Sequence, residues 1–166
     1  MSETSIRVLG ENEWDAYRQA RLRALKESPE AFAAAYDEEA QFDEALWRER
    51  MGRSARLVAE QDDEIVGIVS VRAEHEMFEG AAEVFGLWVP SSLRGTGIAA
   101  KLVQAAARLA TGRGHGQLIY WVGTENARAV AFASSYGFRP SEFRRPMAVQ
   151  GEESVEEIAL TLALHR

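Results

Sequence analysis

The chain has 166 residues, which is enough for one domain with a real hydrophobic core. Hydrophobic residues make up 46% of it, close to the globular norm, so wholesale disorder is not expected. The net charge of −7 makes nucleic acid a poor partner and would more naturally attract a cationic small molecule such as an amine.

Several classes of site and location are also excluded or disfavoured. The chain has no cysteine, which removes disulfides, thiolate metal sites and cysteine nucleophiles. His75, His115 and His165 have no metal-ligand spacing, so we expect no metal. No apolar run approaches the roughly 20 residues that span a bilayer, and the N-terminus shows no secretory signal. We therefore expect a cytoplasmic protein with no membrane partner.

The apolar pattern changes period several times along the chain. In chain order we expect a strand at 6–9, a helix from Asn12 to near Ser28, a helix from its N-cap Asp43 to Gly52, strands at 56–60, 65–72 and 82–89, a helix from Ile98 to Gly112, a strand at 118–122, a helix at 126–135 and a strand at 158–164. Residues 30–36 are ambiguous, and no linker divides the chain. The pattern predicts one mixed α/β (α+β) domain over residues 1–166, with a hairpin-rich first half and a crossover second half.

The most informative stretch is Leu87 to Val103, LWVPSSLRGTGIAAKLV. An apolar strand ends at Pro90, and the segment from Arg94 to Ala99 then opens an alanine-rich helix. Glycines at a helix start let backbone N–H groups approach a ligand, and the first turn has unpaired donors and the positive end of the dipole. With Arg94 beside them, these groups predict a phosphate or pyrophosphate site.

Three other interpretations of this glycine loop are a dinucleotide fingerprint, a P-loop and a structural packing role. The segment Gly95 to Ala100 satisfies G-x-G-x-x-A, a relaxed dinucleotide fingerprint, with Glu125 as the ribose-binding acid. That fingerprint needs its first glycine directly at the strand end, but here five residues, Pro90 to Arg94, intervene. A P-loop fails because no Gly-Lys-Ser/Thr follows. Finally, the glycines could merely permit close packing of the helix on the sheet.

Two motifs together resemble the GCN5-related N-acetyltransferase (GNAT) superfamily. Arg94-x-x-Gly97-x-Ala99 after a Val-Pro strand end resembles its motif A, R/Q-x-x-G-x-G/A. Downstream, Asn126, Ala129, Phe132 and then Gly137-Phe138 resemble its N-x-x-A … G-F segment. The element order agrees over essentially the whole chain, and the segment Ser28 to Phe32 resembles an early segment of bacterial members.

This resemblance implies a mixed, mostly antiparallel central sheet flanked by helices, with splayed central strands, and transfer of an acetyl group from acetyl-CoA to a small-molecule or peptide amine. The pyrophosphate would rest on the loop, and the pantetheine arm would pair with the preceding strand like an added β-strand. The implied cofactor-binding residues are Leu87, Trp88, Val89, Arg94, Gly95, Thr96, Gly97, Ile98, Ala99, Ala100, Asn126 and Phe132. Asn126 could also serve as the N-cap of the following helix. Many relatives are dimers, so a homodimer is compatible with the resemblance.

Acetylation of an amine needs a base for the ammonium proton, and the leaving thiolate benefits from a proton. Glu83 is the candidate base, because it lies on the cofactor-binding strand at a position similar to the base of the histone acetyltransferase branch. Burial among apolar residues would raise its pKa, although an exposed strand-start glutamate is an equal alternative. The family's usual tyrosine position is Ala133, and Tyr136 is expected to be a packing residue. Tyr120 and Ser134 remain candidates for the acid.

Two charge clusters are expected to be solvated surface: Arg139, Arg144 and Arg145, and the acidic run from Asp37 to Glu44. The acidic run could instead select cationic acceptors. The missing tyrosine also keeps a second function open, a CoA-binding sensor or regulatory protein with little transferase activity.

Overall fold

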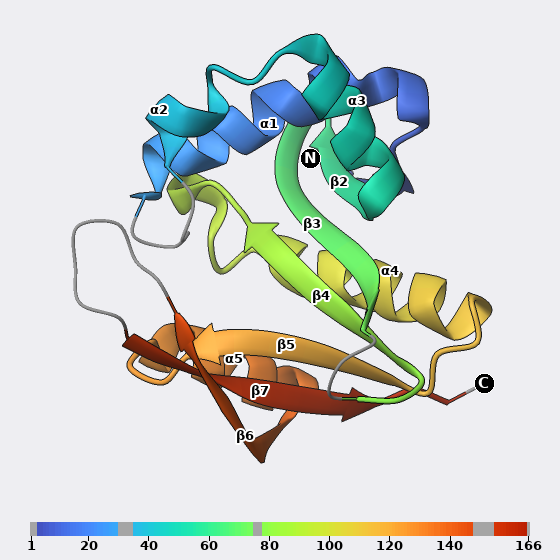
Figure 1. Cartoon of the computed structure of the whole chain (residues 1–166), viewed down its shortest axis with the longest axis vertical. Helices are drawn as coiled ribbons and strands as arrows, with labels where there is room; N and C mark the ends of the chain where they lie inside the picture. The colour runs from blue at the N-terminus through green and yellow to red at the C-terminus, as the bar shows by residue number, and fades with distance from the viewer. Residues whose placement is uncertain (1–2, 30–34, 75–77, 148–154, 166) are drawn as a thin grey trace.

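The computed structural model describes residues 3–29, 35–74, 78–147 and 155–165. Within them a seven-stranded sheet has the order β1-β2-β3-β4-β5-β7-β6 and carries helices on both faces (Figure 1). The strands are β1 (Ser5–Val8), β2 (Ala55–Gln61), β3 (Glu64–Glu74), β4 (Ala81–Trp88), β5 (Gln117–Gly123), β6 (Arg139–Met147) and β7 (Val155–Ala163). The helices are α1 (Trp14–Glu27), α2 (Tyr36–Glu39), α3 (Glu44–Arg53), α4 (Ile98–Gly112) and α5 (Ala127–Tyr136), with single turns η1 (Glu11–Glu13) and η3 (Ser91–Leu93).

The sheet separates at its centre, between β4 and β5. All other neighbouring strands are antiparallel, but these two are parallel and pair only from Ala81–Gln117 to Val84–Tyr120. β4 continues to Trp88 and β5 to Gly123 beyond the last pair, and the two strands diverge there (Figure 1). The expected mixed, mostly antiparallel sheet with splayed central strands is confirmed.

A β-bulge lies in β4 just beyond the last pair with β5. Ser70 of β3 pairs with Phe85, and Ile68 pairs with Trp88, so β4 has two residues between these pairs where β3 has one. Gly86 within the bulge has a φ of +64°, which glycine adopts without a Cβ penalty. The extra residue reverses the alternation of side chains, so Phe85 and Trp88 point to the same face of the sheet.

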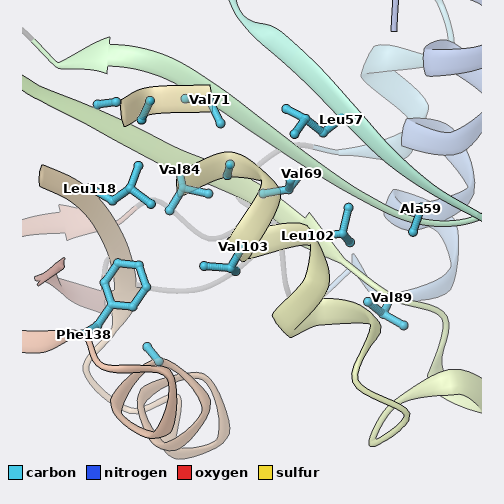
Figure 2. Close-up of a cluster of buried hydrophobic side chains, with 14 of the residues drawn as sticks. Leu57, Ala59, Val69, Val71, Val84, Val89, Leu102, Val103, Leu118 and Phe138 are labelled. Carbon is cyan, nitrogen blue, oxygen red and sulfur yellow. The ribbon is translucent and has the colours of Figure 1, made fainter. Parts of the chain in front are cut away.

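Two main apolar cores cover the two faces of the sheet, and a third, small cluster consists of Phe78, Ala81, Ile119, Trp121 and Ala159. The larger lies under α4 and α5 and includes Leu57, Val69, Val84, Leu102, Val103, Leu118 and Phe138 (Figure 2). The smaller lies under α1 and α3 and includes Leu25, Trp47, Val58, Ile68 and Trp88. Burial of these side chains is the main force that holds the helices on the sheet.

Gly67 of β3 lies directly beneath the first turns of α4. A Cβ at this glycine would be 2.9 Å from Leu102 Cδ1, 3.2 Å from Ile98 Cγ2 and 3.3 Å from the Trp88 carbonyl oxygen. A side chain would therefore push α4 away from the sheet. This glycine sets how closely the helix start approaches β4.

The sequence patterns located most elements to within a few residues, with three differences. Tyr36–Glu39 form the short helix α2, where the sequence patterns assigned no element. Gly52 does not end α3, which continues to Arg53; a single glycine in a helix costs only about 1 kcal/mol. Residues 139–147, to which the pattern assigned no element, form β6. Its two prolines, Pro140 and Pro146, are tolerated because β6 is an edge strand and pairs on one side.

Some expectations fall outside the described residues, namely those for His75 and for Glu30-Ala31-Phe32. Among the residues that are described, no helix is long and apolar enough to cross a membrane. The same residues contain no group of three or more His, Asp or Glu side chains placed to hold a metal ion.

Candidate active site

The loop before α4 presents backbone donors that the helix itself does not use. Gly95 and Gly97 have φ values of +83° and +90°, and Gly97 is the N-cap, so no side chain caps the helix. The first bond of the helix runs from the Lys101 N–H to the Gly97 carbonyl at 3.1 Å. The N–H groups of residues 98–100 precede that bond and lie at the positive end of the helix dipole.

A cavity of about 850 Å³, here called the α4 cavity, opens between this loop, the end of β4 and α5. Both charged residues that line it within the described chain, Arg94 and Arg128, are cationic. It is lined by Leu87, Trp88, Val89, Leu93, Arg94, Gly95, Gly97, Ile98, Ala99, Ala100, Tyr120, Asn126, Arg128, Ala129, Phe132 and Ser135. All the residues expected to bind a cofactor are among them except Thr96, whose hydroxyl donates to the Leu93 carbonyl and closes the turn.

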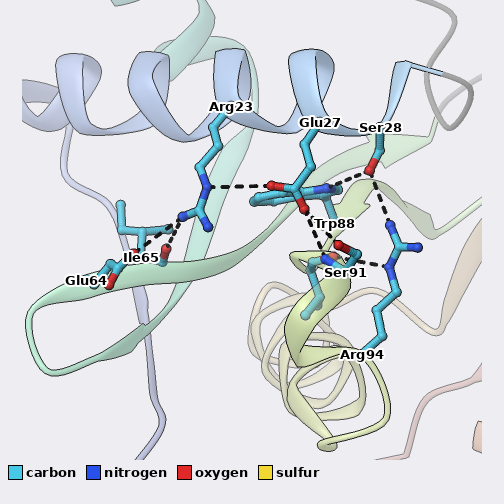
Figure 3. A network of polar contacts seen from close by, with 9 residues as sticks. Arg23, Glu27, Ser28, Glu64, Ile65, Trp88, Ser91 and Arg94 are labelled. Carbon is cyan, nitrogen blue, oxygen red and sulfur yellow. Dashed lines mark hydrogen bonds and ion pairs between the residues drawn. The ribbon is translucent and has the colours of Figure 1, made fainter.

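The C-terminal end of α1 holds this loop in place. Arg94 donates from Nη2 to Ser28 Oγ at 3.2 Å, and Ser28 Oγ also accepts from Trp88 Nε1 at 3.3 Å (Figure 3). Nearby, the Glu27 carboxylate accepts the Ser91 N–H at 3.0 Å. Because a guanidinium has five N–H donors, Arg94 keeps donors for a ligand after anchoring the loop.

Helix α5 supplies the opposite wall of the α4 cavity. Asn126 Oδ1 accepts the Ala129 N–H at 3.1 Å, so the expected N-cap is confirmed. Asn126, Ala129, Phe132 and Ser135 recur every three residues and all line the cavity. Consecutive members of this row are neighbours on the helix surface, but the row turns by about 60° at each step, so no single-face pattern in the sequence would have identified Ser135. Leu93 and Arg128 were also missed, and they follow no comparable pattern.

The tyrosines take different positions. Tyr120 lies at the last β4–β5 pair and lines the α4 cavity, where burial raises its pKa to about 12. It therefore stays protonated at neutral pH. Tyr136 is a packing residue, as expected, with its ring centroid 6.1 Å from that of Phe138. Ala133 is fully buried in the core, and Ser134 is exposed and does not line the cavity.

Glu83 is buried on the α1–α3 face of β4, with 4% of its surface exposed. Arg72 Nη2 lies 3.2 Å from each of its carboxylate oxygens. Burial raises the pKa of Glu83, and the charge of Arg72 opposes that rise without cancelling it. The raised pKa agrees in direction with the sequence expectation. Glu83 lines neither the α4 cavity nor the second cavity described next.

The second cavity, here called the arginine cavity, has a volume of about 180 Å³ and lies between β2, β3, β4, α1 and α3. Half of its lining residues are arginines. They are Tyr17, Arg21, Arg50, Arg53, Ser54, Arg56, Ser70, Arg72, Phe85 and Gly86. It reaches β4 at Phe85 and Gly86, and the α4 cavity reaches the same strand at Leu87. The two cavities therefore meet the bulge of β4 from opposite faces of the sheet.

The acidic run beside this cavity is only partly solvated. Asp37 and Glu38 are exposed as expected, but Glu39 is buried. Its carboxylate accepts from Arg21 at 3.1 Å and from Arg50 at 2.8 Å. Burial alone would raise the pKa of Glu39, but the hydrogen bonds and charges of the two arginines outweigh it and lower the pKa.

The basic cluster on β6 is paired across the edge of the sheet. Arg144 pairs with Glu156, and Arg145 pairs with Glu157 of β7. Arg145 also lies over the Trp121 ring, 4.1 Å from its centroid. Arg144 and Arg145 are therefore held in cross-strand ion pairs. Arg139 and Arg144 are exposed, as expected of a solvated surface.

Comparison with known proteins identifies the family of this chain. Residues 14–138 match the family model described as "Acetyltransferase (GNAT) family". The chain belongs to this family. A curated relative, an uncharacterized N-acetyltransferase from Archaeoglobus fulgidus, is 34% identical over 99 residues, covering 58% of this chain and 67% of the relative.

Solved GNAT structures share the fold. An acetyltransferase of the GNAT family from Streptococcus pneumoniae superposes with a TM-score of 0.79 at 16% identity, over 98% of this chain and all of that one. A putative acetyltransferase from Salmonella typhimurium, solved with its cofactor acetyl-CoA, gives a TM-score of 0.71 at 19% identity, over 98% and 95% of the two chains. GNAT proteins are acetyltransferases that use acetyl-CoA. This membership removes the dinucleotide interpretation of the glycine loop.

Proposed function

We propose that this GNAT chain transfers an acetyl group from acetyl-CoA to a primary amine by direct attack within a ternary complex. One observation carries the proposal: a glycine loop with free N–H donors lies beside the point where β4 and β5 separate. The loop suits a pyrophosphate, and the separated strands suit an extended arm that ends at a reactive group.

The α4 cavity fits the anionic end of acetyl-CoA. Its backbone donors come from the loop and from residues 98–100, and its charged lining residues are Arg94 and Arg128. An ideal Cβ at Gly95 or Gly97 meets nothing within 4 Å among the described atoms, so a ligand can approach both backbones closely. Cationic side chains and N–H donors at one helix start are the usual partners of phosphate groups.

The gap between β4 and β5 fits the pantetheine arm. Residues 85–88 of β4 have no partner strand on the β5 side in the described chain. An arm with two amide groups can pair with that edge as an added strand does. Bound acetyl-CoA would then present its thioester beside the β4 bulge, which the α4 and arginine cavities line from opposite faces of the sheet.

The chain's own side chains would move two protons. The acceptor ammonium loses one proton to Glu83, and the resulting amine attacks the acetyl carbonyl carbon, so that a C–N bond forms while the C–S bond breaks. Tyr120, protonated at neutral pH, donates its proton to the departing thiolate. The second proton, which the nitrogen loses as the amide forms, returns through solvent to the Tyr120 oxygen. Tyr120 is preferred over Ser134 because Tyr120 lines the cavity and Ser134 does not. Positioning of the two substrates supplies the rest of the rate.

A second candidate function is a CoA-binding regulatory protein with little transferase activity. The observation in its favour is Ala133, a buried core residue at the family's usual tyrosine position. Two measurements separate the candidates. Calorimetry should detect acetyl-CoA and not NAD, and a thiol reagent should detect free CoA when a panel of amines is added. Binding without release of CoA from any amine would favour the regulatory function.

The role of Glu83 is tested by the pH dependence of kcat/KM. Activity should rise as the pH passes the raised pKa of Glu83, because only the ionised carboxylate accepts a proton. In Glu83→Gln this limb of the profile should disappear, whereas the exposed Glu79→Gln should leave it in place. An unchanged profile in Glu83→Gln would remove the assignment.

A further inference from the structure

The arginine cavity lies beside the β4 bulge, on the face of the sheet opposite the α4 cavity. Gly86 forms part of its wall, and an ideal Cβ on Gly86 would be 3.8 Å from Arg21 Nη1 and 4.0 Å from Ser70 Oγ. The next residue, Leu87, lines the α4 cavity. A group bound in the arginine cavity is thus one residue along β4 from the proposed position of the thioester.

This cavity is cationic although the chain as a whole is anionic. Five arginines line it, and three carboxylates pair with them in the described residues: Glu39 with Arg21 and Arg50, Glu49 with Arg53, and Glu83 with Arg72. Within the described part of the chain, five arginines therefore face three paired carboxylates here, although the chain as a whole has a net charge of −7. The local field therefore favours an anion, the opposite of what the net charge suggests.

Among the described residues, Arg56 is the one lining arginine that forms no ion pair with a carboxylate. It is 95% buried, donates from Nη1 to Ser70 Oγ at 2.8 Å and from Nη2 to the Arg50 carbonyl at 3.0 Å, and its Nε has no partner among the described atoms. Its guanidinium lies 4.6 Å from the centroid of the Tyr17 ring. Burial, and then the like charges of three neighbouring arginines, lowers its pKa to about 10, so Arg56 is still charged at neutral pH.

A buried cation without a counter-ion destabilises the fold unless something else compensates it. Arg21 and Arg50 are explained as braces, because Glu39 of α2 links them across α1 and α3. Arg53 pairs with Glu49 within α3, and Arg72 pairs with Glu83 between β3 and β4. That explanation does not extend to Arg56, whose hydrogen bonds are to a hydroxyl and a carbonyl. An anion in the cavity would supply the missing charge.

We propose that the arginine cavity binds an oxyanion group of the acceptor, so that the acceptor is an amine carrying a carboxylate or phosphate a few bonds from its nitrogen. The volume of 180 Å³ is below the roughly 300 Å³ at which pockets begin to hold whole ligands, so the cavity takes one end of a molecule. A guanidinium fork matches the geometry of either oxyanion. This inference rests on the proposed transferase function and names its class of substrate.

The test compares matched acceptors on the unaltered, CoA-loaded protein. The probes are the twenty common amino acids, their carboxamides and the corresponding decarboxylated amines, with 2-aminoethyl phosphate and ethanolamine as the phosphate pair. Calorimetry measures binding, and release of CoA thiol from acetyl-CoA measures kcat/KM. For at least one pair, the anionic member should bind about tenfold or more tightly than its neutral counterpart, and the preference should fall as salt is raised.

The pair that shows the preference identifies the oxyanion. A preference for an amino acid over its carboxamide or amine indicates a carboxylate, and a preference for 2-aminoethyl phosphate over ethanolamine indicates a phosphate. Equal binding of anionic and neutral members throughout, or tighter binding of the neutral amines, would overturn the proposal while leaving the transferase function intact. A preference in calorimetry with no CoA release from any amine would uphold the anion site and overturn the transferase function instead.

Variants assign the preference to the cavity. Arg56→Gln should reduce the ratio of anionic to neutral binding about tenfold, and Arg56→Lys should restore part of it because the charge is kept. Arg48→Gln, on the exposed side of α3 and paired with Glu44, is the matched control and should leave the ratio unchanged. If Arg56→Gln does not fold, Arg53→Gln, whose side chain is 57% exposed, should lower the ratio by a smaller factor. An unchanged ratio in all folded cavity variants would contradict the assignment.

Discussion

The close approach of α4 to the sheet depends on Gly67, and Gly67→Ala tests this directly. The added methyl group would lie 2.9 Å from Leu102 Cδ1, 3.2 Å from Ile98 Cγ2 and 3.3 Å from a backbone carbonyl. Leu102 is fully buried and Ile98 is 2% exposed, so neither can move into open space. The helix start must therefore shift by several tenths of an ångström.

The expected cost combines two opposing effects. Overpacking a well-filled core typically costs about 1–3 kcal/mol, whereas replacing glycine by alanine in a strand returns about 0.5–1 kcal/mol through the unfolded chain. We expect a net loss of about 1–2 kcal/mol in the free energy of unfolding, which lowers Tm by roughly 2–8 °C in a chain of this size. The shift also moves the N–H donors of the glycine loop, so the Kd for acetyl-CoA should rise several-fold.

Urea unfolding and calorimetry measure these two effects. Gly52→Ala is the matched control, because a Cβ there meets nothing within 4 Å, and it should stabilise the protein by about 0.5–1 kcal/mol. Combining Gly67→Ala with Leu102→Val removes the nearest carbon, so the pair should couple favourably by about 0.5 kcal/mol or more. Strict additivity, with an unchanged Kd for acetyl-CoA, would refute the reasoning.

Three further outcomes are expected. Glu39→Gln breaks a buried ion pair and should lower the free energy of unfolding at pH 7 by about 3 kcal/mol. Folding lowers the pKa of Glu39, so its contribution to stability is complete above pH 4.5 and is lost as the pH falls through the folded pKa. Below pH 4.5 the free energy of unfolding of the variant should therefore fall less steeply with pH than that of the unaltered protein. Asn126→Ala should lower the free energy of unfolding by about 1 kcal/mol, because the helix loses its N-cap. Asn126→Ser should restore that stability. If Asn126→Ser also restores the Kd for acetyl-CoA in full, capping is the only role of Asn126. Tyr120→Phe should lower kcat roughly 100-fold with the acetyl-CoA Kd unchanged, as measured by steady-state kinetics, if Tyr120 is the proton donor; an unaltered kcat would exclude that role.

The cofactor side of the site was predictable because its signal is local in sequence. Arg94, Gly95 and Gly97 lie within one short segment, and backbone geometry at a helix start follows from residue type alone. The Asn126 cap is equally local, since its partner is three residues away. In each case the chemistry needs only neighbours along the chain.

The arginine cavity could not be predicted in this way. Its residues come from positions 17 to 86, and only the register of β2, β3 and β4 places Arg56 opposite Ser70, and Ser70 opposite Phe85. Net charge pointed toward a cationic acceptor because composition averages over the whole surface. β6 was missed for a related reason: its prolines argue against a strand unless one knows that it lies at the edge.

The divergence of β4 and β5 also has a consequence for the motion of the sheet. Among the described residues, the four pairs from Ala81–Gln117 to Val84–Tyr120 are the only strand pairing that joins β1–β4 to β5–β7. Amide protons of residues 85–88 that face the gap should therefore exchange with solvent faster than those of the paired segment. On the proposed binding mode, an arm lying in the gap would slow that exchange and couple the two halves of the sheet more rigidly. Departure of the product would then require this coupling to be released, which makes the stiffness of the sheet a determinant of turnover.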